Sequence, residues 1–139
     1  MTIDLSSDLG SRVATRLRDE RVIWLTTTAA DGTPQPNPVW FLWNGENVLI
    51  FSVPSQAKLA NIRRNSRVSL NFNSDTYGGQ VAIITGPAAV DPAGPSETEV
   101  AGFGAKYDDG IKSIGLTLQT FLEQYSVPIR VTPEKLRGF

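Results

Sequence analysis

The amino-acid sequence predicts a mainly β (α+β) fold, a small β-barrel with short helices at its periphery. Short stretches rich in β-branched and aromatic residues follow one another through the first two thirds of the chain. Asp-Gly at 31–32 and Asn-Gly at 44–45 separate the first of these stretches and are typical of tight hairpin turns. Closing such a sheet into a barrel removes the exposed edges that an open sheet would carry.

The chain is expected to begin with a helix and a strand. A capping residue among the polar positions 6–8 starts the helix. Leu9, Val13 and Leu17 then recur at every fourth position and give the helix one apolar face. The stretch 22–28 is the first strand, because it is dominated by β-branched and aromatic residues.

The middle of the chain continues as hairpins around one short helix. The predicted elements are a return strand that ends at Trp43, a strand at 48–51, a helix from about 56 to 64, and strands at 67–72 and 80–85. A polar turn at 73–79 joins the last two strands.

Beyond residue 86 the apolar spacing becomes helical. One helix is expected at 97–106, and a second is marked by the apolar face Ile111, Ile114, Leu118 and Phe121 or Leu122. Pro128 is expected to stop the second helix, and residues 129–132 to return to the sheet as the last strand.

Length and composition restrict the function classes. A chain of 139 residues is an ordinary size for one domain, so residues 1–139 are expected to form a single domain around one core. The chain contains no Cys and no His, which removes thiolate nucleophiles, imidazole bases and the common zinc sites. We therefore expect no metal, and chemistry that depends on a cofactor or on carboxylates.

The distribution of charged and apolar residues excludes further classes. No stretch approaches the roughly 18 consecutive apolar residues of a membrane span. The N-terminus has no basic segment followed by an apolar one, so a cytoplasmic protein is expected. The 13 Lys and Arg nearly balance 14 Asp and Glu, and the pI is about 5.4. A nucleic-acid-binding protein would present a larger basic face.

One window of this nearly neutral chain is strongly basic. Residues 47–74 contain no Asp or Glu but hold four cations, Lys58, Arg63, Arg64 and Arg67. Such segregation of charge favours a ligand that carries phosphate or carboxylate.

The short helix expected inside this window is the first candidate site. With Ser55 as its N-cap, Lys58 is the third helical residue, where a cation opposes the helix dipole unless an anion is bound. We predict a phosphate cradle made by the helix N-terminus and the side chains of Ser52, Ser55, Gln56 and Lys58. Asn61 lies one turn further on the same face, as a support of the site or a backbone cap. The alternative is a solvated lysine behind an ordinary capping serine.

The second candidate site has proline at every other position, 34, 36 and 38. Proline has no N–H, so this strand belongs at a sheet edge or a bulge. The backbone around Pro38 and the amides of Asn37, Val39 and Trp40 could then face a planar heterocycle. The alternative is that the prolines protect a sheet edge, while Trp40 and Trp43 fill the core or a dimer seam.

The order of these motifs resembles a known family over residues 12–139. The motifs that carry the resemblance are Asp31-Gly32-x-Pro34-Gln35, Pro38-Val39-Trp40-Phe41, Phe51-Ser52, Lys58-x-x-Asn61-Ile62-Arg63, Arg67-Val68-Ser69-Leu70, Gly86-x-Ala88 and Ile129-Arg130-Val131-Thr132-Pro133. They are similar to the split β-barrel superfamily of pyridoxamine-phosphate-oxidase-like proteins, which bind flavins or deazaflavins. Within it, the chain is most similar to the actinobacterial branch that uses the deazaflavin coenzyme F-420.

The resemblance implies an FMN-binding-like split β-barrel that forms a homodimer with a cofactor in each of two subunit clefts. The cofactor ring would lie along residues 37–40, and the cofactor phosphate near residues 52–58. These are the two candidate sites described above.

One departure from the family pattern favours F-420 over FMN. Oxidases of this superfamily that hold FMN carry basic side chains on a strand at the phosphate site, whereas the matching strand here, 39–43, has no cation. The several carboxylates of the F-420 tail would also be attracted to the acid-free window. FMN is the alternative cofactor.

The activity implied by the resemblance is hydride transfer from reduced F-420 to a conjugated small-molecule acceptor, with the cofactor carrying the chemistry. A sequence without His or Cys fits such an oxidoreductase, and no catalytic residue is assigned. Tyr77, Tyr125 and Arg130 are candidate proton donors by residue type alone. The alternatives are an FMN-dependent oxidoreductase of the same fold and a non-enzymatic carrier of F-420 or flavin.

Overall fold

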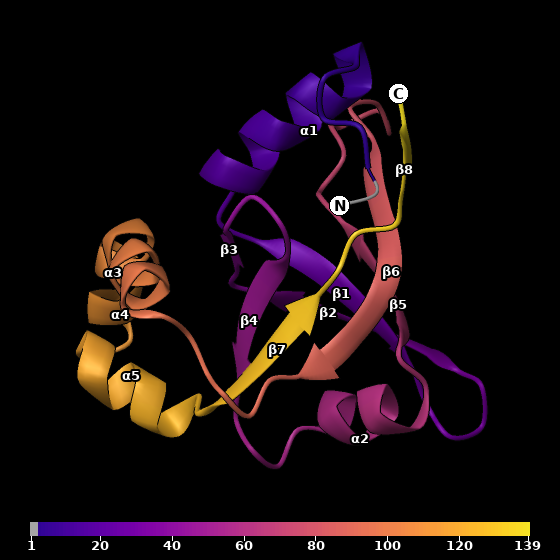
Figure 1. Cartoon of the computed structure of the whole chain (residues 1–139). Coiled ribbons are helices and arrows are strands. Elements are labelled where there is room, and N and C mark those ends of the chain that lie inside the picture. Colours follow the sequence, from indigo (N-terminus) through magenta and orange to yellow (C-terminus); the bar gives the residue numbers. More distant parts are fainter. Residues whose placement is uncertain (1–2) are drawn as a thin grey trace.

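Eight strands form one curled antiparallel sheet, with helices at its two ends and along one side (Figure 1). The computed structural model describes residues 3–139. Its helices are α1 (Asp8–Asp19), α2 (Ala57–Arg64), α3 (Glu97–Lys106), α4 (Asp108–Ser113) and α5 (Leu118–Gln124). Its strands are β1 (Ile23–Thr28), β2 (Pro34–Val39), β3 (Leu42–Trp43), β4 (Val48–Ser52), β5 (Arg67–Asn71), β6 (Ala82–Val90), β7 (Val127–Val131) and β8 (Lys135–Gly138).

The sheet curls into a half-barrel with β2 at an open edge. Its strand order is β2-β1-β5-β6-β7-β4-β3, and β8 pairs with β6 beside this path. The long strand β6 serves two parts of the sheet, because residues 82–85 pair with β8 and residues 88–90 pair with β7. The predicted split β-barrel with short peripheral helices is confirmed.

Two hydrophobic cores lie on opposite faces of β4, in place of the one core expected from chain length. Val48 and Ile50 pack inside the barrel with apolar residues of α1, β1, β5 and β6. Leu49 and Phe51 point the other way and pack beneath α3, α4 and α5. All five residues of β4 are therefore buried. Figure 1 shows the three helices grouped beside β4 and β7.

Local signals for the helices are confirmed at α1 and α3. Ser7 caps α1, since its hydroxyl accepts from the Gly10 amide at 2.9 Å. Ser96 and Glu99 form a capping box at the start of α3. Within residues 3–139 no helix combines the length and the hydropathy needed to cross a bilayer.

The strands differ from the prediction at three places. The return strand is interrupted at 40–41 and forms β2 and β3. β6 continues through Gly86 to Val90, beyond the predicted end at 85. Gly86 is needed in this strand because an added Cβ would lie 1.9 Å from the Thr132 carbonyl oxygen. β8 was absent from the prediction, because its sequence lacks a β-branched run.

The predicted second helix is two helices, and it ends earlier than expected. Gly115 has a φ of +77°, which breaks the helical path between α4 and α5. Pro128 lies inside β7 instead of at a helix end, because α5 already stops at Gln124.

Candidate functional site

Helix α2 lies near the β1–β2 hairpin at the open end of the half-barrel (Figure 1). The Asn61 side chain makes the connection. Its Nδ2 donates to Gln35 Oε1 at 2.7 Å and to Thr27 Oγ1 at 3.0 Å, and its Oδ1 accepts from Arg64 at 2.8 Å. Asn61 is buried, with 5% of its surface exposed. Because the protein engages its polar atoms, Asn61 positions α2 and supports the site from behind.

Strand β2 pairs with β1 along its whole length, with Asn37 opposite Leu25 and Val39 opposite Ile23. The three prolines of β2 have no N–H, so the amides of Asn37 and Val39 must make this pairing and point at β1. This corrects the expectation that both amides are free for a ligand. The outer edge of β2 instead presents proline carbonyls, and the same alternation turns the Trp40 amide away from β1.

A polar cavity of about 380 Å³ separates β2 from the start of α2. Asn37 faces it from the sheet side that also carries buried Leu25, since directly opposite residues in a sheet point the same way. The cavity is lined by Pro34, Gln35, Pro36, Asn37, Gln56, Ala57 and Lys58. The two segments that the sequence singled out therefore meet here.

An aromatic cavity of about 260 Å³ has Lys58 in its wall as well. Its lining is Pro38, Val39, Trp40, Phe51, Lys58, Ile114, Phe121 and Tyr125. The Trp40 indole stacks against the rings of Tyr107 and Phe121, at centroid distances of 4.7 and 5.6 Å and nearly parallel to both. Phe121 in turn stacks on Tyr125 at 4.4 Å. This column of rings fixes Trp40 and gives the cavity a rigid aromatic wall.

Lys58 is the residue that the two cavities share. Its ammonium makes no hydrogen bond or ion pair with any other residue of 3–139, although the side chain is half-buried. Burial lowers the pKa of Lys58 below its ordinary value, because the charged form loses hydration. An anion bound beside Lys58 would replace that hydration with a charge-assisted hydrogen bond.

The start of α2 differs from the predicted cradle. Gln56 is the N-cap instead of Ser55, so Lys58 is the second helical residue, and the first turn contains no acidic residue. Ser55 is exposed, and the buried Ser52 donates its hydroxyl to the Val53 carbonyl at 3.0 Å. Neither serine lines the polar or the aromatic cavity. Of the four residues predicted to form the cradle, Gln56 and Lys58 line these cavities.

Two of the four cations in the acid-free window are engaged elsewhere. Arg67 pairs with Glu134 at 2.7 Å, and Arg64 donates to a backbone carbonyl of β1 at 3.2 Å. Lys58 and Arg63 have no ionic partner among residues 3–139. Within the described chain, Lys58 and Arg63 are therefore the two cations of this window whose donors are left for an anion, while Arg64 adds an unpaired charge nearby.

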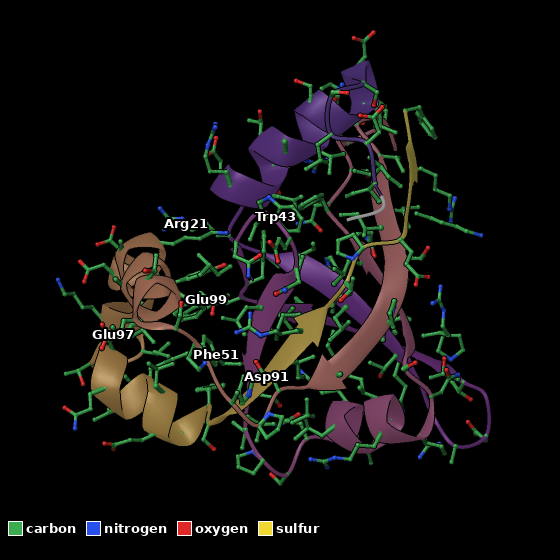
Figure 2. All side chains as sticks on the ribbon, viewed as in Figure 1. Arg21, Trp43, Phe51, Asp91, Glu97 and Glu99 are labelled. Atoms are coloured by element: carbon green, nitrogen blue, oxygen red, sulfur yellow. The ribbon has the colours of Figure 1, made fainter. Side chains whose placement is uncertain are left out.

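Of the three candidate proton donors, Tyr125 alone lies at the candidate site. It lines the aromatic cavity, and its hydroxyl forms no hydrogen bond with the rest of residues 3–139. Tyr77 is 97% exposed in the turn between β5 and β6. Arg130 is held at 2.7 Å by both Asp91 and Glu99, which Figure 2 shows between α3 and β7.

Part of the aromatic wall could not be predicted from local sequence patterns. Phe51 reaches the cavity because it lies on the outer face of β4, where Figure 2 shows it facing α5. Helical spacing identified Phe121 as an apolar position. Local spacing does not reveal that this helix packs against Trp40, which precedes it by most of the chain.

Comparison with known proteins identifies the fold independently. The family described as pyridoxamine 5'-phosphate oxidase matches residues 9–137. Among solved structures, a conserved hypothetical protein of Mycobacterium tuberculosis has a TM-score of 0.72 at 20% identity, covering 94% of this chain and 82% of that one. The heme storage protein HutZ of Vibrio cholerae has a TM-score of 0.68 at 20% identity, covering 91% and 92%. A protein described as F-420 reductase has a TM-score of 0.66 at 23% identity, covering 88% and 94%.

The structural similarities extend over nearly the whole chain, and at these identities they establish a shared fold. No curated protein matches this chain by sequence. The family match covers four of the five helices and seven of the eight strands in full, all but the first residue of α1 and the last residue of β8, and the whole candidate site. The chain belongs to the pyridoxamine 5'-phosphate oxidase family.

Proposed function

We propose that this chain is an oxidoreductase that binds the deazaflavin coenzyme F-420 and passes hydride from its reduced form to a conjugated small-molecule acceptor. The observation that carries the proposal is the position of Lys58, an unpaired and half-buried cation shared by a polar and an aromatic cavity. A ligand with a flat ring and an anionic stem matches this arrangement. The family binds flavin-type cofactors, which have both parts.

The residues that would hold the cofactor form two groups. The ring would lie against the aromatic-cavity residues Pro38, Val39 and Trp40, and the anionic stem would meet the polar-cavity residues Asn37, Gln56 and Lys58. Asn61 would support both groups through its contact with β2. We give Ser52 and Ser55 no direct contact with the cofactor, since they line neither cavity.

The charge of the site favours F-420 over FMN. FMN ends in a phosphomonoester, which carries close to two negative charges at neutral pH, whereas the phosphodiester of F-420 carries one. Lys58 is the only cation in the lining of the polar and aromatic cavities. One ammonium neutralises a phosphodiester, but it leaves a phosphomonoester with an uncompensated charge.

When bound, the reduced deazaflavin supplies hydride. The contribution of the protein would be to orient the two reactants and to keep water away from them. The fixed ring column behind Trp40 suits this role, because a rigid wall holds a flat molecule in one plane. We assign to the Tyr125 hydroxyl a hydrogen bond to the acceptor as negative charge develops on it.

We propose that the active form is a homodimer, as in many members of the family, and that the partner chain covers the open sides of both cavities. The outer edge of β2 is open to a partner, since no strand within residues 3–139 pairs with it, and its proline carbonyls can accept hydrogen bonds from partner side chains.

A non-enzymatic carrier of F-420 or flavin is the second candidate. It is favoured by the similarity to a heme storage protein, which indicates that this fold serves storage as well as catalysis. The lining of the aromatic cavity also contains no carboxylate for proton transfer. An FMN-dependent oxidoreductase is the third candidate.

Measurements of binding and turnover distinguish the three candidate functions. Purified protein is titrated with F-420, FMN and heme, and reduced F-420 is then mixed with the protein and a panel of quinones and enones. We expect the tightest binding for F-420 and oxidation of reduced F-420 faster than in protein-free mixtures. Tightest binding of FMN would support the FMN-dependent enzyme, and binding of F-420 without any turnover would support the carrier.

A further inference from the structure

A third cavity, of about 380 Å³, adjoins the aromatic cavity on the side away from β2. Phe51 and Tyr125 line both cavities, so they form a shared wall. We call it the arginine cavity because Arg63 of α2 lines it. The rest of its lining is mostly apolar and includes Val90, Pro92, Pro95, Leu122, Val127 and Pro128.

Arg63 is exposed on α2 and is the one cation in the lining of the arginine cavity. Asp91 is the one acidic residue in the lining, and other groups occupy both of its oxygens. Its Oδ2 accepts from Arg130 at 2.7 Å, and its Oδ1 accepts from the Ala93 amide at 3.0 Å. Figure 2 shows Asp91 near the start of β7. Arg63 itself has no ionic partner among residues 3–139, and its window of sequence contains no acid.

We propose that the arginine cavity is the acceptor subsite and that it selects a molecule with an apolar, conjugated body and a carboxylate. The planar guanidinium of Arg63 binds the carboxylate, for which its forked geometry is suited. The apolar body lies along Phe51 and Tyr125. This inference rests on the proposed function, because the shared wall puts such a body beside the cavity assigned to the cofactor ring.

The carboxylate has two possible sources, the acceptor and the glutamyl tail of F-420. The apolar lining favours the acceptor. A hydrophilic tail of glutamyl groups gains little from apolar walls and loses hydration beside them. A conjugated acceptor buries its body against the same walls and leaves only its carboxylate for Arg63.

Calorimetric titration without cofactor tests the site directly. The probes are cinnamate, a conjugated carboxylate, and the neutral cinnamamide. Arg63→Gln is compared with Arg12→Gln, which removes an exposed cation from α1. We expect wild type and Arg12→Gln to bind cinnamate equally, and Arg63→Gln to bind it about tenfold more weakly. Cinnamamide affinity is expected to be the same for all three, and their thermal midpoints should coincide.

Three results would overturn the assignment. The first is absence of cinnamate binding by the wild type, and the second is equal affinity of wild type and Arg63→Gln. The third is a loss of cinnamate affinity in Lys58→Met but not in Arg63→Gln. This result would assign the carboxylate to Lys58. A larger loss from Arg63→Gln than from Lys58→Met supports the arginine cavity.

A second titration separates the acceptor from the cofactor tail. F-420 and a deazaflavin that lacks the glutamyl tail are bound to wild type and to Arg63→Gln. We expect equal affinities of the two proteins for each compound. A loss for F-420 alone would assign Arg63 to the tail and contradict the proposal. If wild type binds cinnamate through Arg63 but fails to bind F-420, the carboxylate subsite stands and the proposed function fails.

Discussion

The side-chain amide of Asn61 donates to Gln35 Oε1 at 2.7 Å and joins helix α2 to the edge strand β2. Lys58 is carried by α2, while Pro38 and Val39 follow Gln35 along β2. This contact of the buried Asn61 therefore links the two halves of the proposed cofactor site.

Removal of this contact tests whether it organises the site. We predict that Asn61→Leu lowers the free energy of unfolding by about 1 to 3 kcal/mol, because the buried Thr27 hydroxyl and the Gln35 side-chain amide lose their partner. F-420 affinity should fall as well, although position 61 lines neither cavity. Urea unfolding and F-420 titration measure the two effects. Gln119→Leu, exposed on α5, should change stability by less than about 0.5 kcal/mol. Wild-type values for Asn61→Leu would mean that apolar packing alone holds α2.

The pH dependence of F-420 binding tests the role of the Lys58 charge. Burial lowers the pKa of Lys58, so its ammonium deprotonates at lower pH than that of an exposed lysine. An anionic ligand binds the protonated form more tightly, and the affinity should therefore fall as pH rises through this pKa. The guanidinium of Lys58→Arg stays charged, so this variant should hold its affinity between about pH 7 and pH 10. The same pH profile for wild type and Lys58→Arg would argue against a role of the Lys58 charge in F-420 binding.

Arg130 of β7 and Glu99 of α3 form a bidentate ion pair. Arg130 donates to Glu99 Oε2 at 2.7 Å and to Oε1 at 2.8 Å. These hydrogen bonds lower the pKa of Glu99 from 4.5 to about 2. Because the folded-state pKa lies below the unfolded one, the stabilisation is complete above pH 4.5 and is lost as pH falls towards 2.

Glu99→Gln is therefore expected to lower the free energy of unfolding by about 1 to 2 kcal/mol at pH 7. The variant should also lose less of its free energy of unfolding than the wild type as the pH is lowered. Glutamine can still complete the capping box with Ser96, so the loss reports on Arg130 and on Asn44, whose Nδ2 donates to Glu99 Oε2 at 3.1 Å. Glu97→Gln is the matched control from the same helical turn, and Figure 2 shows Glu97 on the side away from β7. Equal acid sensitivity of wild type and Glu99→Gln would refute this account. Denaturant titrations between pH 7 and about pH 2 measure the free energy of unfolding of the three proteins.

Tyr107 belongs to the core that supports the aromatic cavity, and Tyr77 offers an exposed control for its substitution. The buried Tyr107 hydroxyl donates to the Arg21 carbonyl at 2.7 Å and accepts from the Phe41 amide at 2.9 Å. We predict that Tyr107→Phe costs about 1 to 3 kcal/mol of stability, because two backbone groups lose their partner. Tyr77→Phe, at a side chain 97% exposed, should change stability by less than about 0.5 kcal/mol. Thermal unfolding of both variants provides the comparison, and equal midpoints would exclude this role of Tyr107.

The fold was largely predictable because its elements carry local signals. Turn dipeptides, a cap among residues 6–8 and the spacing of apolar residues located α1, α3 and most strands. The errors occurred where tertiary contacts override local preference. Gly86 was expected to end a strand, but in the structure it lets β6 pass close to Thr132. Gly115 lies within an apolar helical repeat, and its positive φ breaks the repeat into two helices.

The candidate site was predictable only in part. Charge segregation identified Lys58, and the proline pattern identified the strand beside it. The role of Asn61 depends on a contact with Gln35, which lies on a different element, so no local pattern could reveal it. The same holds for Phe121 and Tyr125, because only the folded chain brings α5 against Trp40.

The most direct test of the central claim is a titration of F-420 and FMN against wild type and Lys58→Ala. The account predicts that wild type binds F-420 more tightly than FMN. It also predicts that Lys58→Ala weakens F-420 binding by about 1 to 3 kcal/mol, the range for losing a charge-assisted contact. An unchanged dissociation constant for Lys58→Ala would remove Lys58 from the cofactor site and contradict the claim.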